Sequence, residues 1–223
     1  MDSGAVRPEV TLFAGPTACD IPPAALAGTQ LRPPVRRGDI DRLVESGNSP
    51  GVAIICDGVF QAEPAVSHGE ICRAIDAGWQ VWGVSSIGAI RAHEMRAEGM
   101  HGYGYVYSLF GRFSDFTDDE MCLLHFPEAP YFPVTEALVN LRFALEQRGA
   151  ELGFSKEAQA RLIERLGTLW FGERTEERIR SLMVEEAGVD AARADELLAW
   201  LRANRIKTLD LARLMAERPW QAG

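Results

Sequence analysis

The chain has little positive charge for its size, and this deficit excludes two kinds of partner. Its 223 residues carry 23 Lys and Arg against 32 Asp and Glu, a formal net charge of -9. A general nucleic-acid binder needs a basic face that neutralises phosphates, and an anionic membrane surface also attracts basic residues. We therefore expect neither nucleic acid nor a membrane as a partner.

Long apolar runs, clustered cysteines and cofactor fingerprints are missing as well. No apolar run approaches the roughly 18 residues of a spanning helix, and the N-terminal MDSGAVRPEV lacks a signal-peptide pattern. The cysteines form no CxxC pair and are widely spaced, at Cys19, Cys56, Cys72 and Cys122. We expect reduced thiols in a cytoplasmic protein. Without a glycine fingerprint or zinc-like spacing, we also expect no cofactor and no resident metal.

The first part of the chain alternates strand-like and helix-like segments. The apolar runs EVTLFAG, GVAIICDGVF and WQVWGVSS predict buried strands at 9–15, 51–60 and 79–86. The segments DIDRLVESG, EPAVSHGEICRAIDAG and IGAIRAHEMRAEG predict helices at 39–47, 63–78 and 87–99. This alternation predicts an α/β fold with a mostly parallel open sheet flanked by helices.

The second part of the chain has a different pattern. From about residue 134, apolar residues recur at three- and four-residue intervals, and several segments open on Thr, Ser or Asp. Such segments are capped amphipathic helices. We therefore divide the chain into an α/β core at 1–132 and an all-helical C-terminal extension, a subdomain at 133–223.

Three strand ends carry the chemistry that the sequence offers. In an open parallel sheet, ligands bind beyond the carboxyl ends of the strands. Gly15-Pro16-Thr17, Asp57-Gly58 and Ser85-Ser86-Ile87-Gly88 follow the three predicted strands. If those strands are neighbours, all three ends open into one crevice.

Ser86 has two interpretations. On a tight strand-to-helix turn, its hydroxyl can act as a nucleophile, and the unpaired N–H groups of the first helical turn can hold an oxyanion. The N–H groups of Ile87 and Gly88 are the candidates, and Gly88 would keep the approach open for a substrate carbonyl. Alternatively, Ser85 or Ser86 caps the helix. The spacing does not reproduce G-x-S-x-G, although Ser-Ile-Gly-Ala resembles the nucleophile segment of Clp-type peptidases.

A serine nucleophile needs a base, and the chain has four histidines. His68 opens the helix after the Asp57 strand, and His125 follows an acidic turn. His93 lies within the helix after Ser86, and His101 lies in a glycine-rich loop. Asp57 either orients a base or braces its own turn.

Three further groups leave alternatives open. Cys72 lies four residues after His68, so the two share a helix face. Cys72 is either a reactive thiol beside the imidazole or a buried residue of the core. The acids of TDDE at 117–120 start a helix or bind magnesium. Arg91 pairs with Glu94 or meets an anionic group of the substrate.

Together, these motifs resemble those of the TfuA-like family. The resemblance runs from about residue 10 to 130, and the helical tail adds nothing to it. It rests on GPT and PPVRRGD, Asp57-Gly58, Pro64 with His68 and Glu70, the run from Ser85 to Glu94, Gly99-Met100, and DDE with His125. Ile87 stands where the family pattern has methionine, a swap that conserves volume.

The resemblance implies a function. TfuA-like proteins work beside YcaO enzymes, which replace a peptide-backbone oxygen with sulfur to give a thioamide. The TfuA-like partner is thought to hydrolyse a thiocarboxylated, ubiquitin-like sulfur carrier and so release sulfide. On this basis Ser86 is the expected nucleophile, His68 the leading base, His125 the reserve and Asp57 the orienter. Ser85 joins them, and Ile87, Gly88, Arg91, Thr17 and Gly15 are the expected substrate-binding residues. A non-catalytic adaptor that docks on a YcaO enzyme is the alternative.

Overall fold

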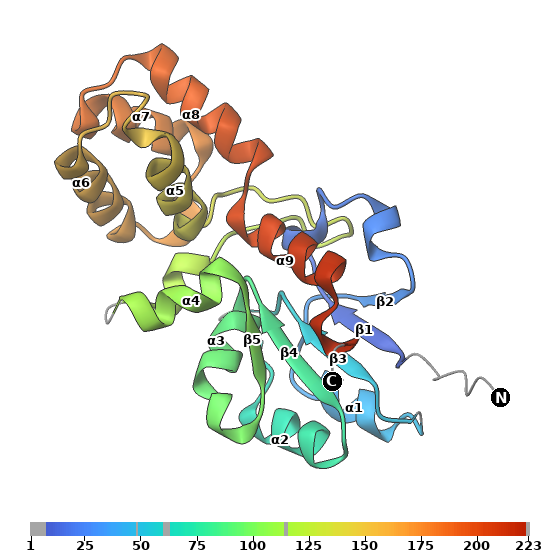
Figure 1. Ribbon diagram of the computed structural model, residues 1–223. Helices are drawn as coiled ribbons and strands as arrows, with labels where there is room; N and C mark the ends of the chain where they lie inside the picture. Colours follow the sequence, from blue (N-terminus) through green and yellow to red (C-terminus); the bar gives the residue numbers. More distant parts are fainter. Residues whose placement is uncertain (1–7, 48, 60–62, 114–115, 222–223) are drawn as a thin grey trace.

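The computed structural model describes residues 8–47, 49–59, 63–113 and 116–221. Five parallel strands form one sheet in the order β2-β1-β3-β4-β5 (Figure 1). Their bounds are β1 (Val10–Phe13), β2 (Thr29–Arg32), β3 (Val52–Ile55), β4 (Gln80–Val84) and β5 (His101–Tyr103). The predicted α/β class with a parallel sheet is confirmed. The three predicted strands β1, β3 and β4 are direct neighbours, so their carboxyl ends do meet at one edge.

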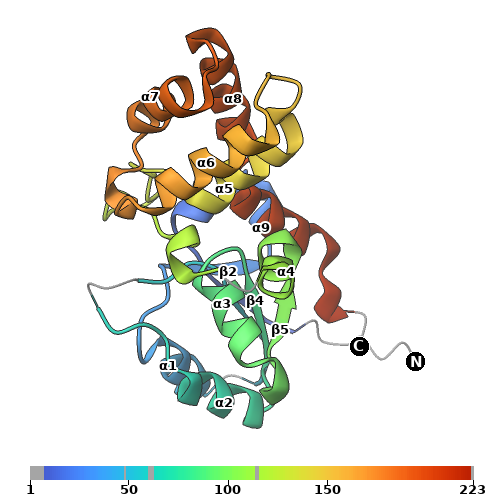
Figure 2. The ribbon, with the colours of Figure 1, turned by 90° about the vertical axis from the view of Figure 1, so that its left-hand side faces the viewer.

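Both faces of the sheet are covered by helices, which explains the continuous apolar run of β3. Ala53 and Ile55 face a core shared with α1 (Asp39–Glu45), α2 (His68–Asp76) and α3 (Ile87–Glu94). Val52 and Ile54 face a second core shared with α9 (Ile206–Glu217). Figure 2 shows α1 and α2 on one side of the sheet and α9 on the other. The four strand residues are fully buried, and each of the Val and Ile side chains among them contributes roughly 1.5–3 kcal/mol.

Two elements differ from the sequence prediction. The helix expected from Glu63 begins at His68, because Ser67 and Glu70 form a reciprocal capping box there. The expected loop around His101 is instead strand β5, followed directly by α4 (Gly104–Arg112). Strand β5 is only 3 residues long, too short for a periodic pattern. Its His101 ring stacks on Trp82 of β4 at 4.6 Å between centroids.

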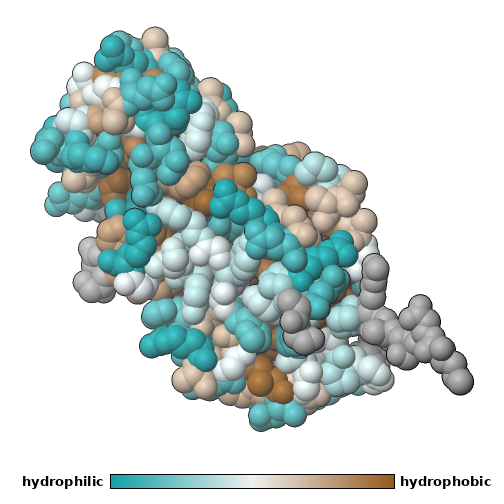
Figure 3. All heavy atoms as spheres, in the orientation of Figure 1, coloured by the Kyte–Doolittle hydropathy of each residue, from teal (hydrophilic) through white to brown (hydrophobic). Residues whose placement is uncertain are grey.

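The C-terminal half contains the predicted helices. They are α5 (Leu138–Ala144), α6 (Lys156–Gly167), α7 (Glu176–Ala187), α8 (Ala191–Ala203) and α9. Ser155, Thr175 and Asp190 cap α6, α7 and α8 through their side chains. The helices α5 to α8 bury a core of their own, and their outer surface is mainly hydrophilic (Figure 3). Helix α9 instead returns to the sheet (Figure 1), and this return places its first turn at the carboxyl edge of the strands.

Among the helices in the described part of the chain, none is long and apolar enough to cross a lipid bilayer.

Candidate active site

The turn between β4 and α3 is abrupt. Ser85 has a φ of 64°, in the left-handed region that serine seldom occupies, and the Ser86 N–H donates back to the Val84 carbonyl at 2.7 Å. Strain of this kind costs on the order of 1–3 kcal/mol and persists only where the surroundings enforce it. The Ser85 hydroxyl donates to the Lys207 carbonyl of α9 at 2.7 Å. Ser85 therefore stabilises the turn, and its hydroxyl is engaged with the Lys207 carbonyl instead of being free to act as a nucleophile.

The Ser86 side chain is free of the helix that it precedes. Ser86 occupies the N-cap position of α3, but its hydroxyl makes no capping hydrogen bond. It lines a cavity of about 200 Å³ at the carboxyl edge of the sheet. The capping alternative is therefore wrong for Ser86, and its hydroxyl faces a space that can hold a small acyl group.

Several chemically active residues line the same cavity, from distant parts of the sequence. Asp57 and Gly58 follow β3, Cys122 and His125 follow the 3-10 turn at Asp118–Met121, and Lys207 lies in the first turn of α9. We call this space, lined also by Ser86, the Ser86 cavity. It joins a hydroxyl, an imidazole, a carboxylate and an ammonium group.

Of the four histidines, His125 is the one that lines the Ser86 cavity. Its Nδ1 lies 2.7 Å from the Phe126 carbonyl oxygen, and because a carbonyl only accepts, Nδ1 must carry the proton. In the neutral ring, Nε2 is then unprotonated and can take a proton. The Tyr131 ring meets the imidazole edge-on at 5.7 Å between centroids and supports its orientation.

The other three histidines lie elsewhere. His68, the expected leading base, does not line the Ser86 cavity; its Nε2 pairs with Glu94 Oε2 at 2.8 Å on the surface. The expectation for His68 is wrong because α2 begins at the capping box of Ser67 with His68 exposed and paired to Glu94. His93 stacks on Phe110, and His101 on Trp82.

Arg91 and the acidic turn have internal partners. Arg91 donates to Glu94 at 2.6 Å and to the Val66 carbonyl, and it is not part of the Ser86 cavity. Glu120 accepts from Arg142, and Asp119 pairs with the buried Arg174. Among the residues that the structure describes, no three His, Cys, Asp or Glu side chains could hold a metal ion together. Arg91 therefore pairs within its helix instead of meeting a substrate in this cavity.

Asp57 is buried and fully bonded. Its Oδ2 accepts from the N–H groups of Gly15 and Thr17, both at 2.9 Å, and its Oδ1 accepts from the Thr17 hydroxyl at 2.6 Å. Gly15 and Thr17 therefore hold Asp57, and their donors do not face a substrate. Lys207 Nζ lies 4.0 Å from Asp57 Oδ1, so the carboxylate balances a buried cation.

Lys207 is the site residue that the sequence prediction missed. Its side chain is 3% exposed, and its Nζ donates to the Met121 carbonyl at 3.0 Å. Its backbone N–H donates to Asn140 of α5, and Glu136 holds both Asn140 and Arg205. This network fixes the first turn of α9 against α5 and keeps the ammonium group in the Ser86 cavity.

The backbone donors near Ser86 differ from those expected. The Gly88 N–H donates to the Cys56 carbonyl at 3.2 Å, so it is not available to an oxyanion. The expectation for Gly88 is wrong because this glycine serves close packing of α3 on β3: an added Cβ would lie 1.7 Å from the Ile55 oxygen. Among the described residues, the N–H groups of Ile87 and Gly58 have no acceptor, and Gly58 lines the cavity.

Cys122 is a poor competitor of Ser86 as nucleophile. Burial raises the pKa of the Cys122 thiol to about 11, and its Sγ lies 3.4 Å from the Asp118 carbonyl oxygen. Because the thiolate is the reactive form, this thiol is almost entirely inert at neutral pH. Cys72 is partly buried and packs against the core on α2, outside the cavity.

A comparison with protein families finds a match. The model described as "TfuA-like protein" matches residues 57–175, more than half of the chain. The matched segment includes Asp57, Ser86, Cys122 and His125 of the Ser86 cavity, but not Lys207. No curated protein matches the chain.

Proposed function

The chain belongs to the TfuA-like family, and from this membership we propose that it is a serine-type hydrolase acting on a thiocarboxylated sulfur carrier. The released sulfide would serve a YcaO-type enzyme in the thioamidation of a peptide backbone. The carrier would be a small ubiquitin-like protein whose C-terminal carboxylate holds the sulfur. The observation that supports this proposal best is the Ser86 hydroxyl in one cavity with His125 and Lys207.

The first chemical step uses the serine and the histidine. His125 Nε2 takes the proton of the Ser86 hydroxyl, and the oxygen attacks the carbonyl carbon of the thiocarboxylate. The tetrahedral intermediate then collapses, the carbon–sulfur bond breaks, and sulfur leaves as hydrosulfide, with the proton of His125 available to it. The carrier remains bound to Ser86 as an ester.

The second step restores the enzyme. A water molecule attacks the ester carbonyl while His125 accepts its proton, and the Ser86 oxygen leaves with that proton. The products are the carrier carboxylate and free Ser86. No external oxidant or reductant is needed, since both steps are acyl transfers.

Lys207 and the two unpaired amides supply the electrostatics. A thiocarboxylate is an anion, so the buried ammonium group of Lys207 attracts it into the cavity and stabilises charge that builds up on oxygen or sulfur. The N–H groups of Ile87 and Gly58 would add hydrogen bonds to the oxyanion. Removing one such group typically costs about 10²–10³ in kcat.

Sulfide release is the direct test. The purified protein is mixed with a thiocarboxylated carrier, and sulfide is measured for the wild type and for Ser86→Ala, His125→Ala and His68→Ala. We expect loss of release in the first two variants and wild-type release in the third. Ser85→Ala is the matched serine control, because the Ser85 hydroxyl bonds to the Lys207 carbonyl and should be needed for stability only. Full release by Ser86→Ala would refute the hydrolase.

The adaptor remains a second candidate because of the surface beside the cavity. Large apolar side chains are exposed on the segment that carries His125: Leu124, Phe126, Phe132 and Val134, with Phe126 at 57%. Exposed apolar side chains grouped in this way are typical of a protein interface. An adaptor would bind the YcaO enzyme through this segment. Its Ser86→Ala variant would then stimulate thioamidation as well as the wild type does.

A further inference from the structure

Strand β2 forms an open edge of the sheet. Within the described part of the chain it pairs with β1 alone, and the remaining strands follow on the far side of β1. The Arg32 carbonyl accepts from Ala14 N–H on the β1 side at 3.1 Å. Because the direction of hydrogen bonding alternates along a strand, the N–H and carbonyl of Leu31 point outward. The Leu31 side chain is 53% exposed, so this edge is open to another chain.

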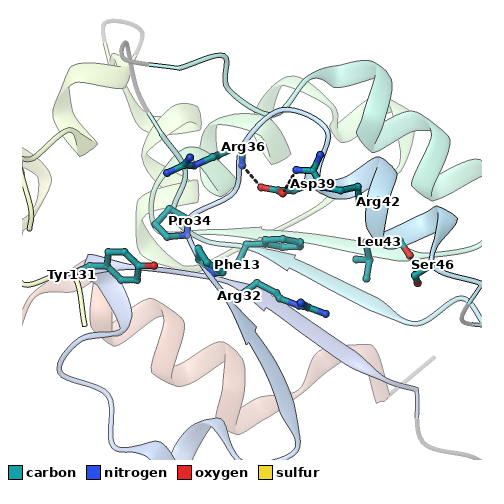
Figure 4. A pocket seen from close by; sticks show the side chains of 10 residues that line it. Phe13, Arg32, Pro34, Arg36, Asp39, Arg42, Leu43, Ser46 and Tyr131 are labelled. Carbon is teal, nitrogen blue, oxygen red and sulfur yellow. Dashed lines mark hydrogen bonds and ion pairs between the residues drawn. The ribbon is translucent and has the colours of Figure 1, made fainter. Parts of the chain in front are cut away.

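A cavity flanks β2 on each face of the sheet. The first, of about 650 Å³, lies on the α1 side and is lined by Arg32, Arg36, Asp39 and Arg42. Figure 4 shows Arg32 on one side of this cavity, Arg36 and Arg42 on the other, and Tyr131 at one end. The second, of about 600 Å³, lies on the opposite face and is lined largely by apolar residues. Arg32, Pro33 and Tyr131 border both cavities, which we call the β2 edge groove.

The two cavities differ in charge. In the first, three arginines face one acid, and Arg42 and Arg36 have acidic partners in Asp39 and Glu63. Among the described residues, the guanidinium group of Arg32 donates only to the side-chain amide oxygen of Gln30. In the second, Ala18, Ile21, Leu26 and Leu31 present apolar surface. A basic cavity in a chain with a net charge of -9 favours an acidic partner.

The groove also leads toward the Ser86 cavity. Tyr131 ends the groove, and its ring contacts His125, which lines the Ser86 cavity. All strands are parallel, so the carboxyl end of β2 lies at the same edge as the turn that carries Ser86. A strand added outside β2 would lie four strand spacings from β4, roughly 19 Å, which about six extended residues can span.

We propose that the β2 edge groove binds the extended C-terminal tail of the protein substrate as an additional parallel strand. The choice of this occupant rests on the proposed function, because the Ser86 cavity would receive the tail's terminal acyl group. Side chains alternate between the two faces of a strand, so acidic side chains would enter the arginine cavity and apolar ones the opposite cavity. The tail therefore has alternating acidic and apolar residues, followed by about six small ones that pass Tyr131.

Peptide binding tests the groove without requiring catalysis. The probe is a fluorescein-labelled peptide, Leu-Glu-Leu-Glu-Leu-Glu-Gly-Gly-Gly-Gly-Gly-Gly, with an ordinary carboxylate end. The control peptide has the same composition in blocks, Leu-Leu-Leu-Glu-Glu-Glu-Gly-Gly-Gly-Gly-Gly-Gly. We expect the alternating peptide to bind at least fivefold more tightly and to protect the Leu31 amide from hydrogen exchange. Equal binding of the two peptides, or no binding of either, would overturn the proposal.

A charge reversal gives a second readout. Arg32→Glu should weaken binding of the alternating peptide about tenfold, since an attraction becomes a repulsion. Arg161→Glu on α6 is the matched control and should bind like the wild type. Unchanged binding by Arg32→Glu, or a concentration-dependent dimer through β2 that excludes the peptide, would overturn the proposal.

Sulfide release from thioacetate separates the groove from the proposed function. Thioacetate needs the Ser86 cavity only, so Arg32→Glu should hydrolyse it at the wild-type rate if the hydrolase proposal holds. Peptide binding without thioacetate hydrolysis would contradict the proposed function but would still support peptide binding in the β2 edge groove. Hydrolysis without peptide binding would contradict the groove alone.

Discussion

Replacing Gly88 by alanine should damage both the fold and the site. An added Cβ at Gly88 would lie 1.7 Å from the Ile55 oxygen and 2.6 Å from the Ile55 carbonyl carbon. A normal contact between these atoms needs roughly 3.2–3.5 Å, so α3 would have to retreat from β3 by about 1.5 Å. The obstacle is backbone at the centre of the sheet, which cannot turn aside as a flexible side chain could.

The cost follows from this geometry. Overpacking of a core costs about 1–3 kcal/mol, and the retreat also breaks the Gly88–Cys56 hydrogen bond, worth about 1 kcal/mol. Better helix propensity returns about 1 kcal/mol. We therefore expect Gly88→Ala to lower the free energy of unfolding by about 1–3 kcal/mol. The shift also displaces Ser86, and a misplacement of this size costs about 10²-fold in rate.

Urea unfolding followed by circular dichroism measures the stability change. The matched control is Gly111→Ala in α4, where no atom lies within 4 Å of the added Cβ. The control should be slightly more stable than the wild type, by about 0.5 kcal/mol. If Gly88→Ala unfolds at the wild-type urea midpoint, then Gly88 does not determine how closely α3 packs on β3, and the reasoning is refuted.

The remaining predictions concern charge and reactivity. Lys207→Met should reduce sulfide release about 10²–10³-fold, whereas Lys156→Met on the surface of α6 should not; equal rates would contradict a role for the buried ammonium group. Burial raises the pKa of Asp210 to about 6, so the folded protein binds the proton more tightly than the unfolded chain. The free energy of unfolding should therefore fall by on the order of 2 kcal/mol between pH 4 and 7. Urea midpoints taken at both pH values measure this change, and Asp210→Asn should remove it. The same pH dependence in Asp210→Asn would contradict the role of Asp210. The Cys122 thiol, whose pKa burial raises to about 11, should resist iodoacetamide at pH 8 until urea unfolds the protein, and rapid native labelling would contradict its burial.

The strands that carry Asp57 and Ser86 could be predicted from the sequence, because buried parallel strands have a recognisable apolar pattern. The apolar runs around Ile54 and Val81 mark buried parallel strands, and their carboxyl ends carry Asp57 and Ser86. Neighbouring strands bring such ends together, whatever the loops do. The choice between His68 and His125 depended on two loops whose course no periodic pattern encodes. Helix α2 begins at His68 because Ser67 caps it through the capping box, and this start leaves His68 on the surface.

Lys207 was missed although a signal existed. The chain has two lysines, and Lys207 stands four residues before Leu211 and seven before Leu214, on the apolar face of the last helix. A charged side chain on such a face has either a buried partner or a functional role. The amphipathic pattern of the tail predicts helices, but it does not say which partner a charge on the apolar face has. The return of α9 to the sheet is tertiary, and no local pattern in the sequence predicts it.

Peptide-mapping mass spectrometry of a quenched reaction tests the central claim most directly. The wild-type protein is mixed with thiocarboxylated carrier, acid-quenched within seconds and digested. The hydroxyl of Ser86 is predicted to carry the carrier's C-terminal acyl group as an ester, which Ser86→Ala lacks and His125→Ala fails to accumulate. An ester or thioester on another residue, or sulfide release by Ser86→Ala at the wild-type rate, would contradict it.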